Sequence, residues 1–153
     1  MQRKISNHIS YKEATNSNTA RRYGINNFPD SNQLEAMILV AEKIFEPVRV
    51  HFKKRIRVNS FFRINRLNRI LKGSSKSQHV KGEAIDVDGL DGLTNKQIFD
   101  YIRENLDFDQ LIWEFGTNEE PDWVHFSYKK NGTNRKQVLK AFRKYGKTRY
   151  KVI

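Results

Sequence analysis

Two of the four histidines lie in short segments that also carry carboxylates. His79 and Asp86 belong to the segment SQHVKGEAID (residues 77–86), and His125 ends the segment PDWVH (residues 121–125). Two histidines and one carboxylate are a common ligand set of an open zinc site, which leaves a coordination position for water. A neighbouring carboxylate can take a proton from that water. These residue types predict metal-assisted hydrolysis, provided that the fold brings them together.

The spacing of His79 and Asp86 restricts the local fold. Zinc ligands lie about 2.0–2.2 Å from the metal, but seven residues span more than about 20 Å when extended and about 10 Å in a helix. The chain must therefore turn back between them, and Gly82 permits such a turn. Residues 83–88 then alternate polar and apolar, which predicts a strand with Asp86 and Asp88 on one face. Asp88 is thus an alternative ligand.

The second segment also predicts a strand. In residues 123–128, Trp123 and His125 share one face. Asp122 follows a proline, so we expect it on the incoming loop, where it can curl back toward His125. Taken alone, a histidine on a strand is more often a packed or surface residue than a metal ligand, and spacing by itself leaves both interpretations open.

The remaining pattern predicts an α+β fold, with a small, mainly antiparallel sheet flanked by helices. Apolar residues at helical spacing predict a helix that is capped by Asp30 or Ser31 and ends at Pro47. Two further helices are expected at residues 63–71 and 94–105. Additional strands are expected at residues 48–52, 56–62 and 110–115.

The charge of the chain is concentrated near its C-terminus. The 153 residues include 29 Lys and Arg against 17 Asp and Glu, a formal charge of +12. Residues 1–122 hold 19 basic and 17 acidic residues, whereas residues 123–153 hold ten basic residues and no acidic one. We therefore expect a domain at residues 1–141 and a basic tail at residues 142–153. This tail is either a solubilising segment or a contact for an anionic envelope.

Composition excludes several classes of site. The chain has no cysteine, which excludes disulfides, thiol nucleophiles and thiolate zinc ligands. No apolar run approaches the roughly 18 residues of a membrane span. Residues 1–18 are polar and resemble no signal peptide. We therefore expect a monomer that is made in the cytoplasm.

Taken together, the motifs resemble the zinc D-Ala-D-Ala carboxypeptidase family of peptidoglycan peptidases, which includes phage endolysins that cut L-Ala-D-Glu bonds. The pattern Ser77-x-His79-x-x-Gly82-x-Ala84-x-Asp86 followed by Asp122-x-x-His125 carries the resemblance. The segments SFFR (60–63), TARRYGINN (19–27) and IWEFG (112–116) extend it to about residues 5–141. It implies the hedgehog-like fold of the single-domain, endolysin-like branch. It also implies an enzyme that either acts in the cytoplasm or reaches the cell wall after release, as in phage lysis.

The resemblance also implies residue roles. It assigns His79, Asp86 and His125 to Zn²⁺, Asp122 to the general base and then acid, and Arg63 to the substrate or the developing oxyanion. Other residues keep more than one interpretation. Ser77 and Gln78 contact substrate or only shape the loop, Trp123 forms a pocket wall or packs in the core, and Glu114 is a partner of the zinc ligands, an alternative base or a solvated strand residue.

The function that we expect is hydrolysis of a peptide bond in peptidoglycan stem peptides or cross-links, by a D,D-carboxypeptidase or endopeptidase. One alternative is a catalytically inactive module that binds cell wall or another polyanion through the basic tail. Nucleic acid is a weaker alternative, because the first 122 residues supply no matching basic excess. Cleavage that depends on metal would distinguish the first function from the others.

Overall fold

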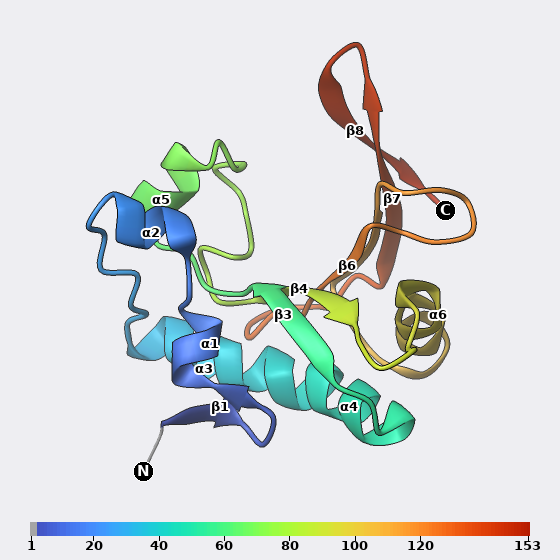
Figure 1. Cartoon of the computed structure of the whole chain (residues 1–153), viewed down its shortest axis with the longest axis horizontal. Coiled ribbons are helices and arrows are strands. Elements are labelled where there is room, and N and C mark those ends of the chain that lie inside the picture. Colours follow the sequence, from blue (N-terminus) through green and yellow to red (C-terminus); the bar gives the residue numbers. More distant parts are fainter. Residues whose placement is uncertain (1–2) are drawn as a thin grey trace.

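A computed structural model describes residues 3–153 as an α+β fold built on a six-stranded sheet (Figure 1). The strand order is β3-β4-β6-β5-β7-β8, and each pair is antiparallel except the parallel pair of β5 and β7. The strands are β3 (Ile56–Ser60), β4 (Ala84–Gly89), β5 (Gln110–Glu114), β6 (Trp123–Ser127), β7 (Gln137–Lys144) and β8 (Lys147–Val152). The predicted fold class is confirmed.

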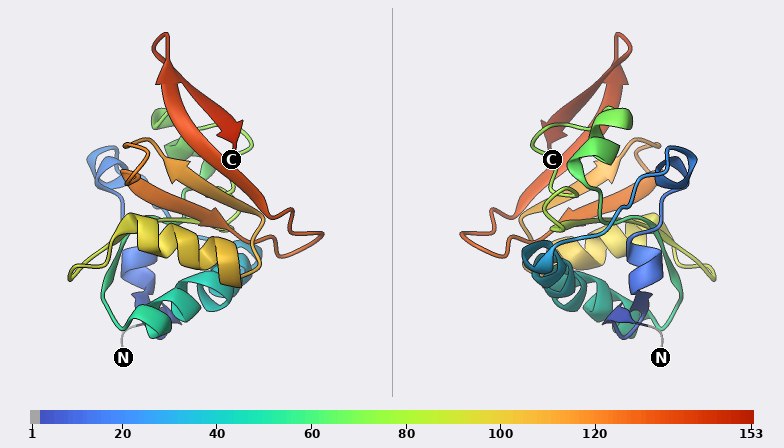
Figure 2. Two further views of the ribbon diagram at one scale, coloured as in Figure 1. Left: turned by 90° about the vertical axis from the view of Figure 1, so that its right-hand side faces the viewer. Right: turned by 90° about the vertical axis from the view of Figure 1, so that its left-hand side faces the viewer.

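Helices cover one face of this sheet (Figure 2). The covering helices are α3 (Ser31–Val40), the π-helical η1 (Ala41–Phe45), α4 (Glu46–Phe52) and α6 (Asn95–Asn105). Apolar side chains of both layers form the main core, among them Met37, Ile44, Ile85, Ile102, Val124 and Phe126. Smaller elements complete the N-terminal half: β1 (Lys4–Ser6), β2 (Ile9–Ser10), α1 (Tyr11–Ala14), α2 (Asn18–Arg22) and α5 (Asn65–Ile70). Within residues 3–153, no helix has the length and apolar character needed to cross a membrane.

Pro47 does not end the long helix, and residues 48–52 are helical, so both of these predictions are wrong. The segments α3, η1 and α4 follow one another without a break. Pro47 lies in the first turn of α4, where a missing N–H is least costly. The preceding π turn alters the hydrogen-bond pattern at the point where proline would interrupt it. The apolar face continues into α4 because Val48 is buried in the core.

Most of the other predicted elements are confirmed. The strands at residues 56–62, 83–88, 110–115 and 123–128 correspond to β3, β4, β5 and β6. The helix at 94–105 is α6, and Thr94 caps it through a capping box with Gln97. Asp30 caps α3 in the same manner. The helix at 63–71 is the shorter α5.

The basic C-terminal segment forms part of the sheet. β7 pairs with β5 in parallel, and β8 pairs with β7 as a hairpin. The boundary that we expected between residues 141 and 142 falls inside β7, where Ala141 is fully buried and the residues from Arg143 onward are exposed. The tip of this hairpin extends beyond the rest of the molecule (Figures 1 and 2).

Candidate metal centre

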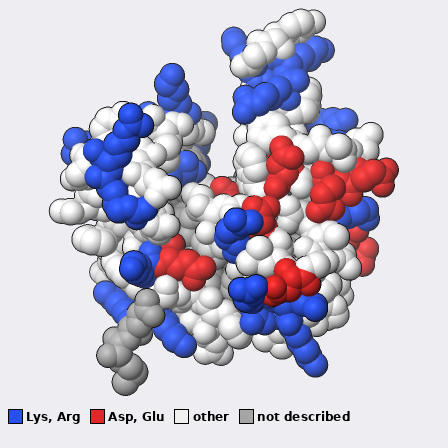
Figure 3. All heavy atoms as spheres, viewed as in Figure 1, with Lys and Arg blue, Asp and Glu red and all other residues white. Residues whose placement is uncertain are grey.

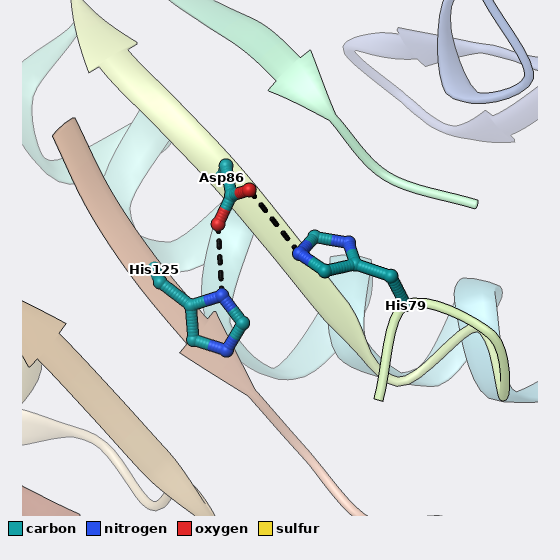
Figure 4. A group of neighbouring side chains, drawn as sticks. All are labelled: His79, Asp86 and His125. Carbon is teal, nitrogen blue, oxygen red and sulfur yellow. Dashed lines mark hydrogen bonds and ion pairs between the residues drawn. The ribbon is translucent and has the colours of Figure 1, made fainter. Parts of the chain in front are cut away.

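His79, Asp86 and His125 meet on the sheet face opposite the helices (Figure 4). The Asp86 carboxylate lies between the two rings. Its Oδ2 is 3.2 Å from Nε2 of His79, and its Oδ1 is 2.8 Å from Nδ1 of His125. One ligand atom from each residue lies within 4.8 Å of the other two. Two nitrogens and one oxygen in this arrangement suit a zinc ion that keeps an open position.

The register of two strands brings two of these residues together. Asp86 on β4 lies directly opposite His125 on β6, so their side chains project from the same face of the sheet. His79 reaches the same point from the loop before β4. That loop turns at Gly82, whose φ is +75°, and a Cβ there would lie 2.5 Å from the backbone oxygen of Gln33. The turn expected between His79 and Asp86 therefore requires glycine.

Backbone groups fix the orientation of His79. Its Nδ1 lies 2.7 Å from the carbonyl oxygen of Phe61, and a carbonyl oxygen only accepts, so Nδ1 carries the proton. The other ring nitrogen, Nε2, then faces Asp86. The backbone N–H of His79 donates to Oγ of Ser77 at 3.3 Å, and that of Arg63 donates to the His79 carbonyl at 3.2 Å. Ser77 therefore shapes the loop that presents the ligand.

The electrostatics of the site favour a charged Asp86. Burial raises the pKa of this carboxyl, but the two histidines outweigh burial, and the net pKa lies well below its ordinary value. An ionised Asp86 has the charge state that a metal ligand needs. A cation placed between His79, Asp86 and His125 would meet one nitrogen from each histidine and one carboxylate.

Glu114 is the second carboxyl group of the site. It lies on β5 next to Trp123 of β6, lines the same groove and is only 8% exposed. Burial raises its pKa to about 7; His125 opposes this shift and Asp86 adds to it. A carboxyl with a pKa near neutrality can both accept and return a proton at physiological pH. The solvated-strand interpretation of Glu114 is thereby excluded.

Asp122 does not join this group. Its side chain is exposed and borders a smaller neighbouring hollow, whereas the main groove is lined without it. The backbone N–H of Asp122 donates to the Glu114 carbonyl at 2.9 Å, and its carbonyl accepts from Asn95. The first bond holds the backbone of Asp122 beside the end of β5, and its side chain lies outside the main groove instead of curling toward His125 as expected. Asp88, the alternative ligand, is bound to Asn59 and Asn95 instead.

A groove of about 730 Å³ surrounds the His-Asp-His group, and Arg63, Gln78 and Trp123 line it. Nε of Arg63 is buried and has no hydrogen-bond partner among residues 3–153. Burial lowers the pKa of Arg63, and Asp86 partly opposes this. Gln78 donates to Asp109 at 3.1 Å, but its buried Oε1 also lacks a partner in the part of the chain that the structure describes. Both side chains therefore keep hydrogen-bonding capacity for a ligand.

The fold and the site define an α+β protein with a candidate metal centre, His79, Asp86 and His125, in a groove. The sequence profile of the family described as Peptidase M15 matches residues 7–127, and the chain belongs to this family. Peptidases of this family depend on a metal ion, and the buried group His79, Asp86 and His125 is able to hold one. A search of curated proteins gave no match. The family match ends at the last residue of β6, so β7 and β8 lie outside it.

Proposed function

We propose that the chain is a zinc-dependent peptidase that hydrolyses a peptide bond in peptidoglycan stem peptides or cross-links. The observation that carries the proposal is the meeting of His79, Asp86 and His125 beside the buried carboxyl of Glu114, in a chain of the Peptidase M15 family. The absence of thiolate ligands favours a catalytic site with three protein ligands over a closed structural one.

Different side chains of the groove perform different steps of the proposed reaction. When bound, zinc would polarise the scissile carbonyl and lower the pKa of a water molecule. Glu114 accepts a proton from the attacking water and returns it to the nitrogen of the leaving amine. Arg63 donates hydrogen bonds to the carbonyl oxygen as charge develops on it, or to a substrate carboxylate. Asp122, the base that the resemblance implies, would need the loop at residues 116–122 to move before it reached the groove.

The biological setting that we propose is cell-wall degradation by a D,D-carboxypeptidase or endopeptidase of the endolysin type. Such an enzyme is made in the cytoplasm and meets the wall after release. Monomeric action suits the site, because every residue assigned to it comes from one chain.

A second candidate function is binding to a polyanion without catalysis. It is favoured by the basic side chains on the face of the hairpin that points away from the groove. Along each strand these residues alternate with groove-facing ones, and they are Lys140, Lys144, Lys147, Arg149 and Lys151. Such a surface attracts an anionic envelope polymer, and the attraction weakens with salt. In an active enzyme the same surface would hold the protein near its substrate.

The test is digestion of purified peptidoglycan by zinc-loaded protein, with and without a chelator, followed by mass spectrometry of the released fragments. We expect new peptide termini that disappear with the chelator, and their masses identify the bond. Folded, zinc-loaded protein that binds the wall but releases no fragment would overturn the peptidase proposal and support the binding module.

A further inference from the structure

The groove has two walls from distant parts of the chain. One wall comes from Arg63 and from the loop at residues 73–81. The other comes from the β7–β8 hairpin through Arg143, Thr148 and Tyr150. In Figure 3, basic side chains cover the upper parts of both lobes, and a hollow separates them. The hairpin is therefore placed where a substrate above the His-Asp-His group would touch it.

Strand register places Tyr150 beside the catalytic residues. Trp123, Glu114, Ala141 and Tyr150 are paired in turn across β6, β5, β7 and β8, so all four share the groove face. Neighbouring strands are about 4.8 Å apart, which puts Tyr150 two strands from Glu114. The residue between them, Ala141, is small and fully buried and leaves room for the phenol. Burial raises the pKa of Tyr150, and the charges of Glu114 and Asp86 raise it further, in agreement with this position.

Arg143 is held beside Tyr150 on the same wall. Its guanidinium carbon lies 4.9 Å from the centroid of the Phe115 ring, which in turn packs 5.4 Å from the ring of Trp123. A guanidinium that stacks on an aromatic face keeps the N–H groups on its edge free for hydrogen bonds. Arg143 forms no ion pair with any carboxylate of residues 3–153. It is a positioned cation whose charge the rest of the described chain does not neutralise.

The basic residues of the hairpin lie on its two opposite faces. Arg143 pairs with Thr148 on the groove face, whereas Phe142 pairs with Arg149 on the opposite face. Strand alternation means that these two arginines point in opposite directions although both are exposed. The charge in the groove is thus a local feature of the site, distinct from the general basicity of the hairpin.

We propose that the β7–β8 hairpin is a substrate-binding wall, on which Arg143 and Tyr150 bind a free carboxylate of an acidic peptide. The phenol donates one hydrogen bond, and the guanidinium donates one or two. This wall selects peptides that carry a carboxylate away from the metal centre over their amidated counterparts. The inference rests on the proposed function in taking a peptide as the ligand, but the residues concerned lie outside the family match.

The experiment measures peptide affinity by calorimetry, with zinc-loaded Glu114→Gln protein so that cleavage during the titration is about 10²- to 10⁴-fold slower. The probes are L-alanyl-γ-D-glutamyl-L-lysyl-D-alanyl-D-alanine and the same peptide with the D-glutamate α-carboxylate converted to an amide. We expect Arg143→Gln to weaken binding of the acidic peptide about three- to tenfold, and Tyr150→Phe about threefold. Both changes leave binding of the amidated peptide within about twofold, as expected when a variant removes only the contact to the carboxylate.

Arg149→Gln is the matched control, because it removes the same charge from the other face of the same hairpin. Its affinity for both peptides stays unchanged if the groove face carries the recognition. Equal losses in Arg143→Gln and Arg149→Gln, or equal affinity of the parent protein for both peptides, would overturn the inference. Failure of the proposed function would look different: selective binding of the acidic peptide would persist, while peptidoglycan digests by the otherwise unaltered protein gave no fragments.

Discussion

His79 and Phe61 are joined by a hydrogen bond of 2.7 Å between the imidazole Nδ1 and the backbone carbonyl oxygen. The bond fixes which ring nitrogen carries the proton and turns the other toward Asp86. Because the acceptor belongs to the backbone, this orientation does not depend on the side chain of residue 61. The segment that follows β3 thus orients a proposed metal ligand and, two residues later, supplies Arg63 to the same groove.

Replacement of any of the three proposed ligands, His79, Asp86 or His125, by alanine is expected to abolish stable zinc binding. Loss of a partner that only orients a ligand costs about 10- to 100-fold in metal affinity, and loss of a ligand itself costs more. Zinc per chain, measured by mass spectrometry after dialysis, should fall from near one to near zero.

Asp88→Asn is the control for these variants. Asp88 lies on β4 two residues after Asp86, but its carboxylate is bound to Asn59 and Asn95. The variant should retain its zinc. If Asp88→Asn lost zinc while Asp86→Ala kept it, the assignment of the ligands would be wrong.

Glu114→Gln is expected to lower kcat about 10²- to 10⁴-fold, the usual range for loss of a general acid–base group. Zinc content should stay unchanged, because Glu114 lies outside the His-Asp-His group. Asp122→Asn should reduce kcat less than about threefold, since its side chain is exposed outside the groove. The reverse order of effects would identify Asp122 as the base and require movement of its loop.

The sequence was sufficient to predict the strands that carry the site. Alternation along β4 and β6 is strict because one face of each strand packs in the core, and the same alternation directs Asp86 and His125 to the other face. The turn at Gly82 followed from the distance between His79 and Asp86. These predictions depend on local geometry alone, which a single sequence contains.

The position of the second carboxyl group could not be predicted in the same way. Asp122 is near His125 in the sequence, and Glu114 is near it in the sheet. Which of them supplies the second carboxyl group of the site depends on whether the chain at Asp122 continues the strand or turns back toward His125. That outcome is set by hydrogen bonds to Glu114 and Asn95, which belong to other elements. The parallel pairing of β7 with β5 is likewise a long-range contact, and a basic segment gives little local sign of it.

The raised pKa of Glu114 predicts a specific pH dependence of stability in the metal-free protein. Its pKa is about 7 when folded and near the ordinary glutamate value of 4.5 when unfolded. Between these values the folded state holds a proton that the unfolded state has released, so the free energy of unfolding falls as pH rises from 4.5 to 7. The full effect is about 3 kcal/mol at most.

Glu114→Gln removes this titration. In chelator-treated protein the variant should therefore gain stability over the parent protein between pH 5 and pH 8. Urea unfolding of both proteins at the two pH values measures the difference. A stability difference that is the same at pH 5 and pH 8 would contradict a raised pKa at this position.

Gly82→Ala tests whether the turn between His79 and Asp86 needs glycine. A φ of +75° costs alanine about 1 kcal/mol. A Cβ would also lie 2.5 Å from the Gln33 oxygen and 2.8 Å from Cγ of Met37, and this overpacking adds about 1–3 kcal/mol.

Gly92→Ala is the control, because φ there is +87° but no atom lies within 4 Å of the added Cβ. We expect Gly82→Ala to lower the free energy of unfolding by about 2–4 kcal/mol and to weaken zinc binding, since the strain displaces His79. Gly92→Ala should lose only about 1 kcal/mol and keep its zinc affinity. Equal losses in the two variants, measured by urea unfolding and zinc titration, would mean that backbone conformation alone makes glycine necessary at residue 82, and that contact with α3 does not position the ligand.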